Sequence, residues 1–421
     1  MAHHLHDGSF QHLLDRLNRF PLGCPPEDAL FRILAILFST QEAELVSQLP
    51  VRSFTAATAA RIWDMPESKA QKTLDGLADR ALLLDIPHQG VTHYTLPPPM
   101  AGFFEFALMR IRSDIDQKAL SALFHQYINL EDRFIIDLIG GAETQVGRVF
   151  VNEPALERSS RELQVLSYER ASEVIRTASA IGVGLCYCRH KKQHLGTACN
   201  APLEVCLTLN GAAESLIRHG YLQPIDSGRG LEILDQCRRS NLVQFGENVR
   251  EGVNFICNCC PCCCEALVAA RKFGMLHPVH TTAYLPIIDQ TRCHRCKVCQ
   301  AVCPVSGITD FGSAGLTVDV DRCLGCGLCV QACPQHVITL RARETRPLTP
   351  LNSAHRVVLM AIERGKLQHL LFDGKQLAGH RILSCILGVI LRLPPVKQLL
   401  ASRQIRSRFL EWLLSRHQAY G

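Results

Sequence analysis

The feature that most constrains this chain is a run of four cysteines that occurs twice with the same spacing. The first run is Cys293, Cys296, Cys299 and Cys303, followed by Pro304, and the second is Cys323, Cys326, Cys329 and Cys333, followed by Pro334. The flanking residues repeat as well, because Asp289 aligns with Asp319 and Ile308 with Ile338. A duplicated unit of strand, cysteine loop, short helix and strand is therefore predicted.

The spacing within each run suits a metal–sulfur cube. Cysteines at i, i+3 and i+6 let one tight loop bind three corners of the cube, and the fourth ligand must come from elsewhere. A four-cysteine zinc site is the alternative, but zinc sites usually pair two C-x2-C knuckles rather than two such runs in tandem. The pattern favours iron–sulfur chemistry.

Residues 284–340 resemble the bacterial-type 2[4Fe-4S] ferredoxin domain. In that family the cysteine before the proline binds the other cluster. The resemblance implies two [4Fe-4S] clusters and two ligand sets. The first set is Cys293, Cys296, Cys299 and Cys333, and the second is Cys323, Cys326, Cys329 and Cys303.

The two loops differ in charge. The first contains His294, Arg295 and Lys297, whereas the second has Gly325 and Gly327. Cations favour the reduced, more negative cluster, and glycines allow close approach of amides to sulfur. We therefore expect two clusters of unequal potential.

Ten of the twelve cysteines that precede this domain fall into two further groups, and six of these ten lie within residues 257–264. They are Cys186, Cys188, Cys199, Cys206, Cys257, Cys259, Cys260, Cys262, Cys263 and Cys264. A strand-like segment at 253–256 precedes the dense group and a helix is predicted at 265–273, so the helix dipole lowers the pKa of nearby thiols. These thiols are candidate ligands of a third iron–sulfur cluster or thiolate metal site. The alternative is that several are buried apolar residues.

Basic residues follow Cys188, at Arg189, His190, Lys191, Lys192 and His194. They suit an anionic substrate or an electron-rich cluster, and a solvated basic loop is the alternative. The sequence contains no dinucleotide fingerprint or phosphate loop. No catalytic residue is assigned, and a role as an oxidoreductase subunit or reductase stays open.

The N-terminal region predicts short helices at 28–38, 42–48, 55–63 and 68–81, followed by a two-stranded ribbon around Gly90. This order resembles a winged helix-turn-helix. The candidate recognition helix carries Lys69, Gln71, Lys72 and Arg80 together with Asp75 and Asp79. That mixture is weak for binding phosphates.

The expected fold is α+β and multidomain. It comprises a winged-helix-like domain (1–100), a helical connector (101–145), a cysteine-rich central α/β region (146–283), a ferredoxin-like dicluster module (284–342) and a helical C-terminal segment (343–421). Within that last segment, helices are expected at 357–371 and 397–415.

Two functions follow from these patterns. The first is an iron–sulfur electron-transfer protein that works with a redox partner protein or delivers electrons to the central thiols. The second is a redox-sensing regulator that binds DNA through the N-terminal domain. The 21 cysteines without a secretory signal favour a cytoplasmic location, and no apolar run predicts a transmembrane segment. The apolar connector is a candidate homodimer face.

Overall fold

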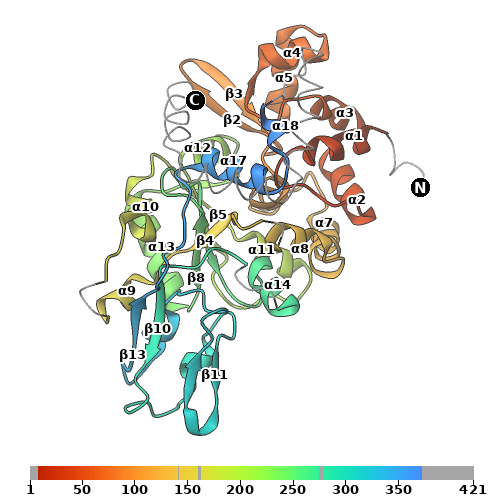
Figure 1. Ribbon diagram of the computed structural model, residues 1–421. Coiled ribbons are helices and arrows are strands. Elements are labelled where there is room, and N and C mark those ends of the chain that lie inside the picture. Colours follow the sequence, from red (N-terminus) through yellow and green to blue (C-terminus); the bar gives the residue numbers. More distant parts are fainter. Residues whose placement is uncertain (1–7, 141, 160–162, 275–277, 372–421) are drawn as a thin grey trace. The chain divides into compact units, whose positions relative to one another are not determined.

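The computed structural model describes residues 8–140, 142–159, 163–274 and 278–371, and the chain forms two compact units (Figure 1). The first unit combines residues 1–144, 215–221 and 353–421, and the second combines 145–214 and 222–352. The architecture is mixed α/β. Among the described helices, none is both long and apolar enough to cross a membrane. The helix predicted at 397–415 lies outside the described residues.

The first unit begins with five helices and a small antiparallel sheet. The helices are α1 (Gly8–Leu17), α2 (Asp28–Leu37), α3 (Thr40–Ser47), α4 (Ala56–Trp63) and α5 (Glu67–Ala78). The strands β1 (Phe54–Thr55), β2 (Leu84–His88) and β3 (Val91–Thr95) pair in the order β1-β3-β2. Ser39 and Glu42 form a capping box that starts α3, and Gly90 adopts φ 79° in the β2–β3 turn.

An aromatic core fills the rest of the first unit. The chain continues through α6 (Phe104–Phe106), α7 (Gln117–His125) and α8 (Arg133–Gly140), and later returns as α17 (Ser353–Glu363) and α18 (Leu367–Leu371). Phe104 packs against Phe103, Phe124 and Phe134, and all four side chains are buried. The apolar sequence of the connector therefore builds an internal core in this structure.

The second unit is built on a six-stranded antiparallel sheet in the order β4-β8-β9-β6-β5-β7. The strands are β4 (Gly147–Val149), β5 (Ile181–Leu185), β6 (Glu204–Leu209), β7 (Gln223–Pro224), β8 (Val243–Glu247) and β9 (Phe255–Cys259). The helices are α9 (Glu153–Glu157), α10 (Ala171–Thr177), α11 (Tyr187–His194), α13 (Ser227–Arg239) and α14 (Glu265–Phe273), and α12 (Asn210–Arg218) begins in this unit, with its residues from 215 onward assigned to the first. Residues of α10 and α13 pack with β5 and β6 in one hydrophobic cluster.

The double cysteine run forms two similar halves. The first half contains β10 (Tyr284–Ile288), α15 (Val298–Ala301) and β11 (Ile308–Asp310), and the second contains β12 (Leu316–Val318), α16 (Leu328–Ala332) and β13 (Ile338–Ala342). This is the order of elements that the repeat predicts. β10 pairs with β13, and β11 pairs with β12. The pairing brings the end of each half beside the loop of the other.

Candidate iron–sulfur and metal centres

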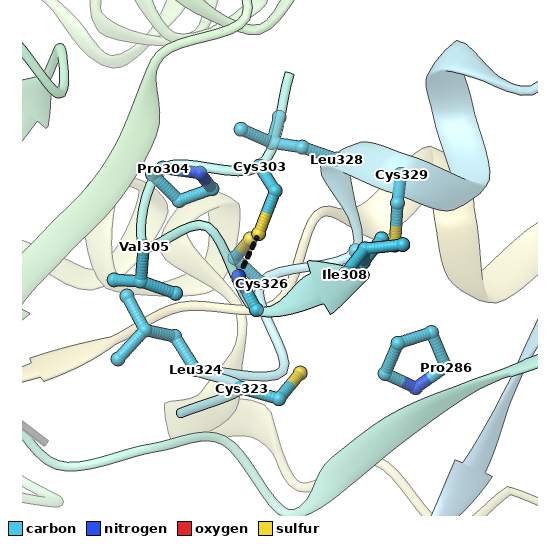
Figure 2. A pocket seen from close by; sticks show the side chains of 12 residues that line it. Pro286, Cys303, Pro304, Val305, Ile308, Cys323, Leu324, Cys326, Leu328 and Cys329 are labelled. Carbon is cyan, nitrogen blue, oxygen red and sulfur yellow. Dashed lines mark hydrogen bonds between the residues drawn. The ribbon is translucent and has the colours of Figure 1, made fainter. Parts of the chain in front are cut away.

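Two cavities each collect four cysteines from both runs. One is lined by Cys293, Cys296, Cys299 and Cys333. The other is lined by Cys323, Cys326, Cys329 and Cys303, whose side chains appear in Figure 2. In each cavity, three cysteines come from one loop and the fourth from the other half of the repeat. The structure thus brings together the two sets that the ferredoxin resemblance implies.

Backbone amides lie next to several of these sulfurs. The amides of Arg295 and Gly325 each donate to the sulfur two residues earlier, Cys293 or Cys323, at 3.4 Å. The amide of Gly307 donates to the sulfur of Cys303 at 3.2 Å (Figure 2). Four thiols with amide donors are the donor set that iron–sulfur clusters use in proteins. The residues present therefore fit such a group in both cavities.

The two loops have the same backbone conformation despite their different sequences. Arg295 and Lys297 have φ of 52° and 61°, and their counterparts Gly325 and Gly327 have φ of 71° and 82°. The Gly325 amide lies close to sulfur, as expected, but so does the Arg295 amide, because the equivalent distance is 3.4 Å in both loops.

The structure shows a different reason for Gly325. A Cβ at this position would lie 2.1 Å from the hydroxyl oxygen of Thr282 and 2.3 Å from the carbonyl oxygen of Tyr284. The second loop is pressed against the segment that enters β10, whereas Arg295 in the first loop is exposed. The glycine is therefore required by close packing as well as by its positive φ.

The cations of the first loop have partners in the β11–β12 hairpin. Lys297 forms an ion pair with Asp310 at 2.9 Å, and Arg295 donates to the carbonyls of Gly312 and Ser313. The Lys297 ammonium holds the pKa of Asp310 below its usual value. The positive charge near the first cavity is thus partly balanced by this carboxylate.

The cavities also differ in their exposure to solvent. Cys296 in the first loop is exposed, whereas Cys326, its counterpart, is half-buried. Burial raises the pKa of Cys326 to about 12 and that of Cys323 to about 11. The thiol of Cys326 is thus less accessible to solvent than that of Cys296.

The ten upstream thiols separate into two groups. Four of them, which we call the tetrathiol group, have sulfurs that all lie within 4.8 Å of one another: Cys199, Cys260, Cys262 and Cys263. The other six, which we call the hexathiol group, are Cys186, Cys188, Cys206, Cys257, Cys259 and Cys264. All ten are free thiols.

Strand alternation explains much of this division. The strand expected at 253–256 is instead β9 (Phe255–Cys259), so two of the cysteines lie within a strand rather than after it. Cys257 and Cys259 pair with Phe245 and Val243 of β8 and point to one face of the sheet. Ile256 belongs to the hydrophobic cluster of the opposite face. The helix that follows runs over Glu265–Phe273, as expected, with Cys264 as its N-cap.

The hexathiol group is joined by hydrogen bonds between neighbouring thiols. Cys257 contacts Cys206 and Cys259, Cys264 contacts Cys259 and Cys188, and Cys188 contacts Cys186. Hydrogen bonds from Cys188 and Cys259 hold the pKa of Cys264 near 5, and those from Cys206 and Cys259 lower the pKa of Cys257. The same hydrogen bonds raise the pKa of Cys188 and Cys259, so Cys257 and Cys264 are the members of the group that favour the thiolate, the form that binds metals.

Arg189 supplies positive charge between the two groups. Its side chain is 1% exposed and donates to the carbonyl oxygen of Asn258 and to the sulfur of Cys260. Within the described residues, no carboxylate forms an ion pair with it. Burial opposes its charge, but the thiols of Cys186, Cys260 and Cys259 raise its pKa overall.

The basic segment after Cys188 is not a solvated loop. It forms α11, in which Arg189, His190 and Lys191 are buried. Lys191 forms a buried ion pair with Glu265, the first residue of α14. This pair joins the two helices that carry Cys188 and Cys264.

The hexathiol group and the second cavity share one hydrophobic cluster. Cys259 and Cys264 are buried in this cluster with Val305, Leu324 and Leu328, and Cys257, Cys303 and Cys326 pack against it. Val305, Leu324 and Leu328 line the second cavity (Figure 2). The sequence could not reveal this proximity, because more than 40 residues separate Cys259 from Cys303.

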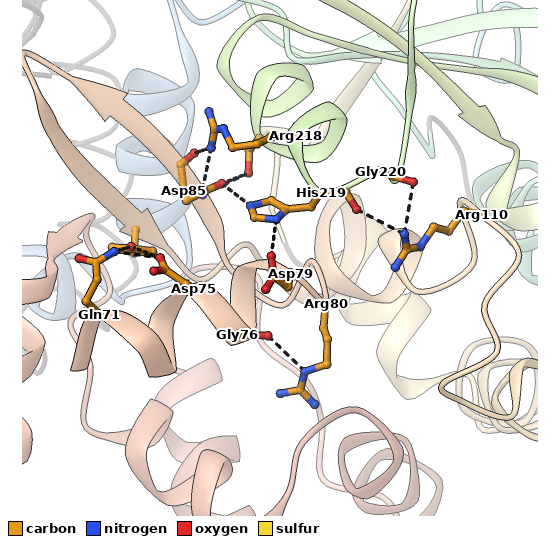
Figure 3. Close-up of polar contacts among 12 residues, drawn as sticks. Gln71, Asp75, Gly76, Asp79, Arg80, Asp85, Arg110, Arg218, His219 and Gly220 are labelled. Carbon is orange, nitrogen blue, oxygen red and sulfur yellow. Dashed lines mark hydrogen bonds and ion pairs between the residues drawn. The ribbon is translucent and has the colours of Figure 1, made fainter. Parts of the chain in front are cut away.

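Polar contacts occupy much of the candidate recognition helix in the first unit. Tyr94 donates to Asp75 at 2.6 Å, and Gln71 contacts both of these residues (Figure 3). Asp79 pairs with His219, and Arg80 pairs with Glu42. Lys69 and Lys72 remain as exposed cations on α5.

Residues 285–334 match the family described as a 4Fe-4S dicluster domain. Comparison of the chain with curated proteins and with solved structures gives no match. The matched range includes all eight cysteines of the double run, from Cys293 to Cys333. The chain therefore carries a 4Fe-4S dicluster domain, which binds iron–sulfur cofactors.

Proposed function

We propose that this chain is an electron-transfer protein of the cytoplasm that carries two [4Fe-4S] clusters and connects them to the hexathiol group. Cys293, Cys296, Cys299 and Cys333 would hold one cluster, and Cys323, Cys326, Cys329 and Cys303 the other. When bound, such clusters take up and release single electrons. The observation that carries the proposal is the hydrophobic cluster shared by the second cavity and the hexathiol group.

The two cavities differ in their surroundings, so we assign them different roles. The first cavity contains the exposed Cys296, so a redox partner protein can approach it from solvent. Val305, Leu324 and Leu328, which line the second cavity, belong to the same buried cluster as Cys259 and Cys264 of the hexathiol group. Close apolar packing of this kind holds its members in fixed relative positions.

The hexathiol group has the donors for a third iron–sulfur cluster or another thiolate metal site. Its thiols come from β6, β9, α11 and the start of α14, and the Lys191–Glu265 pair holds two of these elements together. Arg189 supplies a buried cation that balances the negative charge of thiolates. Together these residues can keep an electron-rich site inside the protein.

Iron and sulfide analysis of the anaerobically purified chain tests the proposal. Two clusters give about eight irons and eight sulfides per chain, and a cluster in the hexathiol group adds to both. The variant Cys326→Ser should lose about four irons. Cys237→Ser is the matched control, because Cys237 is a buried thiol of α13 that lies in neither cavity and in neither thiol group.

The rate at which each centre is reduced, followed by rapid-freeze EPR, then separates transfer from simple storage. In Cys326→Ser, a reductant protein should still reduce the first cavity's cluster but should reduce the hexathiol site much more slowly. Equal reduction rates in wild type and Cys326→Ser would contradict the connection. Absence of sulfide in the wild-type protein would contradict the clusters themselves.

A DNA-binding regulator is the second candidate, supported by the order of α4, α5, β2 and β3, which we interpret as a winged helix. The exposed Lys69 and Lys72 are the cations that α5 offers to phosphates. Gel-shift binding to genomic fragments, with wild type and Lys69→Glu/Lys72→Glu, tests this role. Sequence-specific binding that the double variant loses would support it, and binding without sequence preference that vanishes at modest salt would count against it.

A further inference from the structure

The tetrathiol group has a geometry unlike that of the cluster cavities. The sulfur of Cys199 lies 3.6 Å from that of Cys260 and 3.8 Å from that of Cys263, and the sulfurs of Cys262 and Cys263 are 3.8 Å apart. Four thiolates bound to one tetrahedral ion at about 2.3 Å stand about 3.8 Å apart. The spacing is thus that of ligands around a single metal ion.

A cubane cluster needs a wider arrangement, because each cysteine binds a different iron. The spacing of the cysteines in the two cluster cavities can be compared with that in the tetrathiol group. Among the described residues, no three of the eight cysteines in the two cluster cavities gather within 4.8 Å of one another, whereas all four thiols of the tetrathiol group do. Disulfides are also excluded as the reason for the close approach, because these thiols are free and disulfide sulfurs are about 2 Å apart.

The backbone around the tetrathiol group is well supported. Three of its cysteines lie in one turn between β9 and α14, which is closed by a hydrogen bond from the Cys264 amide to the Cys260 carbonyl at 3.2 Å. Arg271 of α14 donates to the carbonyl of Pro261 in the same turn. Cys199 reaches the group from the segment after α11. These contacts fix the turn that carries three of the four thiols.

Burial and charge also suit a metal ion. Cys263 and Cys260 are 0% and 4% exposed, whereas Cys262 is exposed, so an ion can enter from solvent and be enclosed on its inner side. Four thiolates around a divalent ion leave two negative charges in excess. The buried guanidinium of Arg189, which contacts the Cys260 sulfur, compensates part of that charge.

We infer that Cys199, Cys260, Cys262 and Cys263 bind one tetrahedral divalent ion, Zn²⁺ or Fe²⁺, at a site separate from the iron–sulfur clusters. Binding converts the thiols to thiolates and releases their protons to solvent. The site joins the turn before α14 to the segment after α11, so it stabilises the part of the fold that carries the hexathiol group. This inference depends on these four residues and not on the dicluster function.

Metal analysis of the full chain, purified anaerobically, tests the inference. We expect one metal equivalent per chain that has no matching sulfide: zinc, or iron in excess of sulfide. Replacement of this ion with Co²⁺ should give the absorption of tetrahedral Co²⁺–thiolate coordination. Cys262→Ser is the main variant because its side chain is exposed and its replacement spares the core, and Cys237→Ser is the control.

Cys262→Ser should lose the extra ion to a chelator at least about tenfold faster than wild type and Cys237→Ser do, while the iron and sulfide of the clusters stay unchanged. Two results would overturn the inference. One is an ion that leaves Cys262→Ser and wild type at the same rate. The other is a loss of iron and sulfide in equal amounts from Cys262→Ser, which would place a cluster at the tetrathiol group. Loss of the dicluster iron in the wild type would contradict the proposed function and leave the zinc result standing.

Discussion

The buried guanidinium of Arg189 donates to the sulfur of Cys260 at 3.5 Å. Cys186 and Cys259 of the hexathiol group interact electrostatically with the same side chain and raise its pKa. One cation therefore interacts with both thiol groups of the central sheet. It is suited to tune the potential of any redox centre that these thiols hold.

Replacement of Arg189 with Met should make the potential of the hexathiol site more negative by at least about 60 mV, which is a tenfold change for one electron. The reason is that a nearby cation stabilises the extra electron of the reduced state. Potentiometric titration followed by EPR measures the shift. Arg189→Lys should shift the potential less, because the charge is retained.

Arg176→Met is the matched control for Arg189. Arg176 belongs to the same unit but is half exposed and pairs with Glu173 on the surface of α10. Its replacement should leave the potential unchanged. An equal shift in both variants would show that the effect of Arg189 is not local.

Gly325→Ala should damage the second cluster cavity. The added Cβ would lie 2.1 Å from Thr282 Oγ1, and φ is 71°. Gly312→Ala separates these two effects, since Gly312 has φ 62° but nothing within 4 Å of the added Cβ. We expect Gly312→Ala to lower the free energy of unfolding by about 1–2 kcal/mol. Gly325→Ala should lower the free energy of unfolding by more than this, and the variant should lose about four irons. Full iron content in Gly325→Ala would contradict the packing argument.

Loss of one partner of the Lys191–Glu265 ion pair should destabilise the fold more than loss of both partners. Lys191 is 0% exposed and Glu265 is 3% exposed. Loss of one partner leaves a buried charge without its main counter-charge, so Lys191→Met should destabilise folding by about 3–5 kcal/mol.

The double variant Lys191→Met/Glu265→Leu should recover much of that loss, because neither charge then remains. Denaturant unfolding of the wild type, both single variants and the double variant measures the coupling. Additive losses in the double variant would show that the two side chains act independently.

Tyr94→Phe should weaken the N-terminal sheet. The hydroxyl of the buried Tyr94 donates to Asp75 at 2.6 Å, and this bond joins β3 to α5. We expect a loss of about 1–2 kcal/mol in the free energy of unfolding. Asp75→Asn and the double variant complete the cycle, and a coupling energy near zero would contradict the role of this bond.

The local elements of the fold could be predicted from the sequence. α14 has the bounds expected for it, and α2, α4 and the β2–β3 ribbon lie close to their expected ranges. These features depend on neighbouring residues, whose helical or alternating spacing is visible in the chain itself. The left-handed conformation of Arg295 and Lys297 could not be predicted in the same way, because neither residue favours it.

The spacing of the double cysteine run by itself indicated the dicluster domain, because the positions of three cysteines within one short loop are set by local geometry. The division of the ten upstream thiols was decided only by tertiary structure. Cys199 is 61 residues from Cys260, yet their sulfurs lie 3.6 Å apart, and Cys260 follows Cys259 directly but belongs to a different group. Antiparallel pairing and the alternation of side chains along β9 separate adjacent thiols and bring distant ones together, and neither is encoded in the spacing of cysteines along the chain.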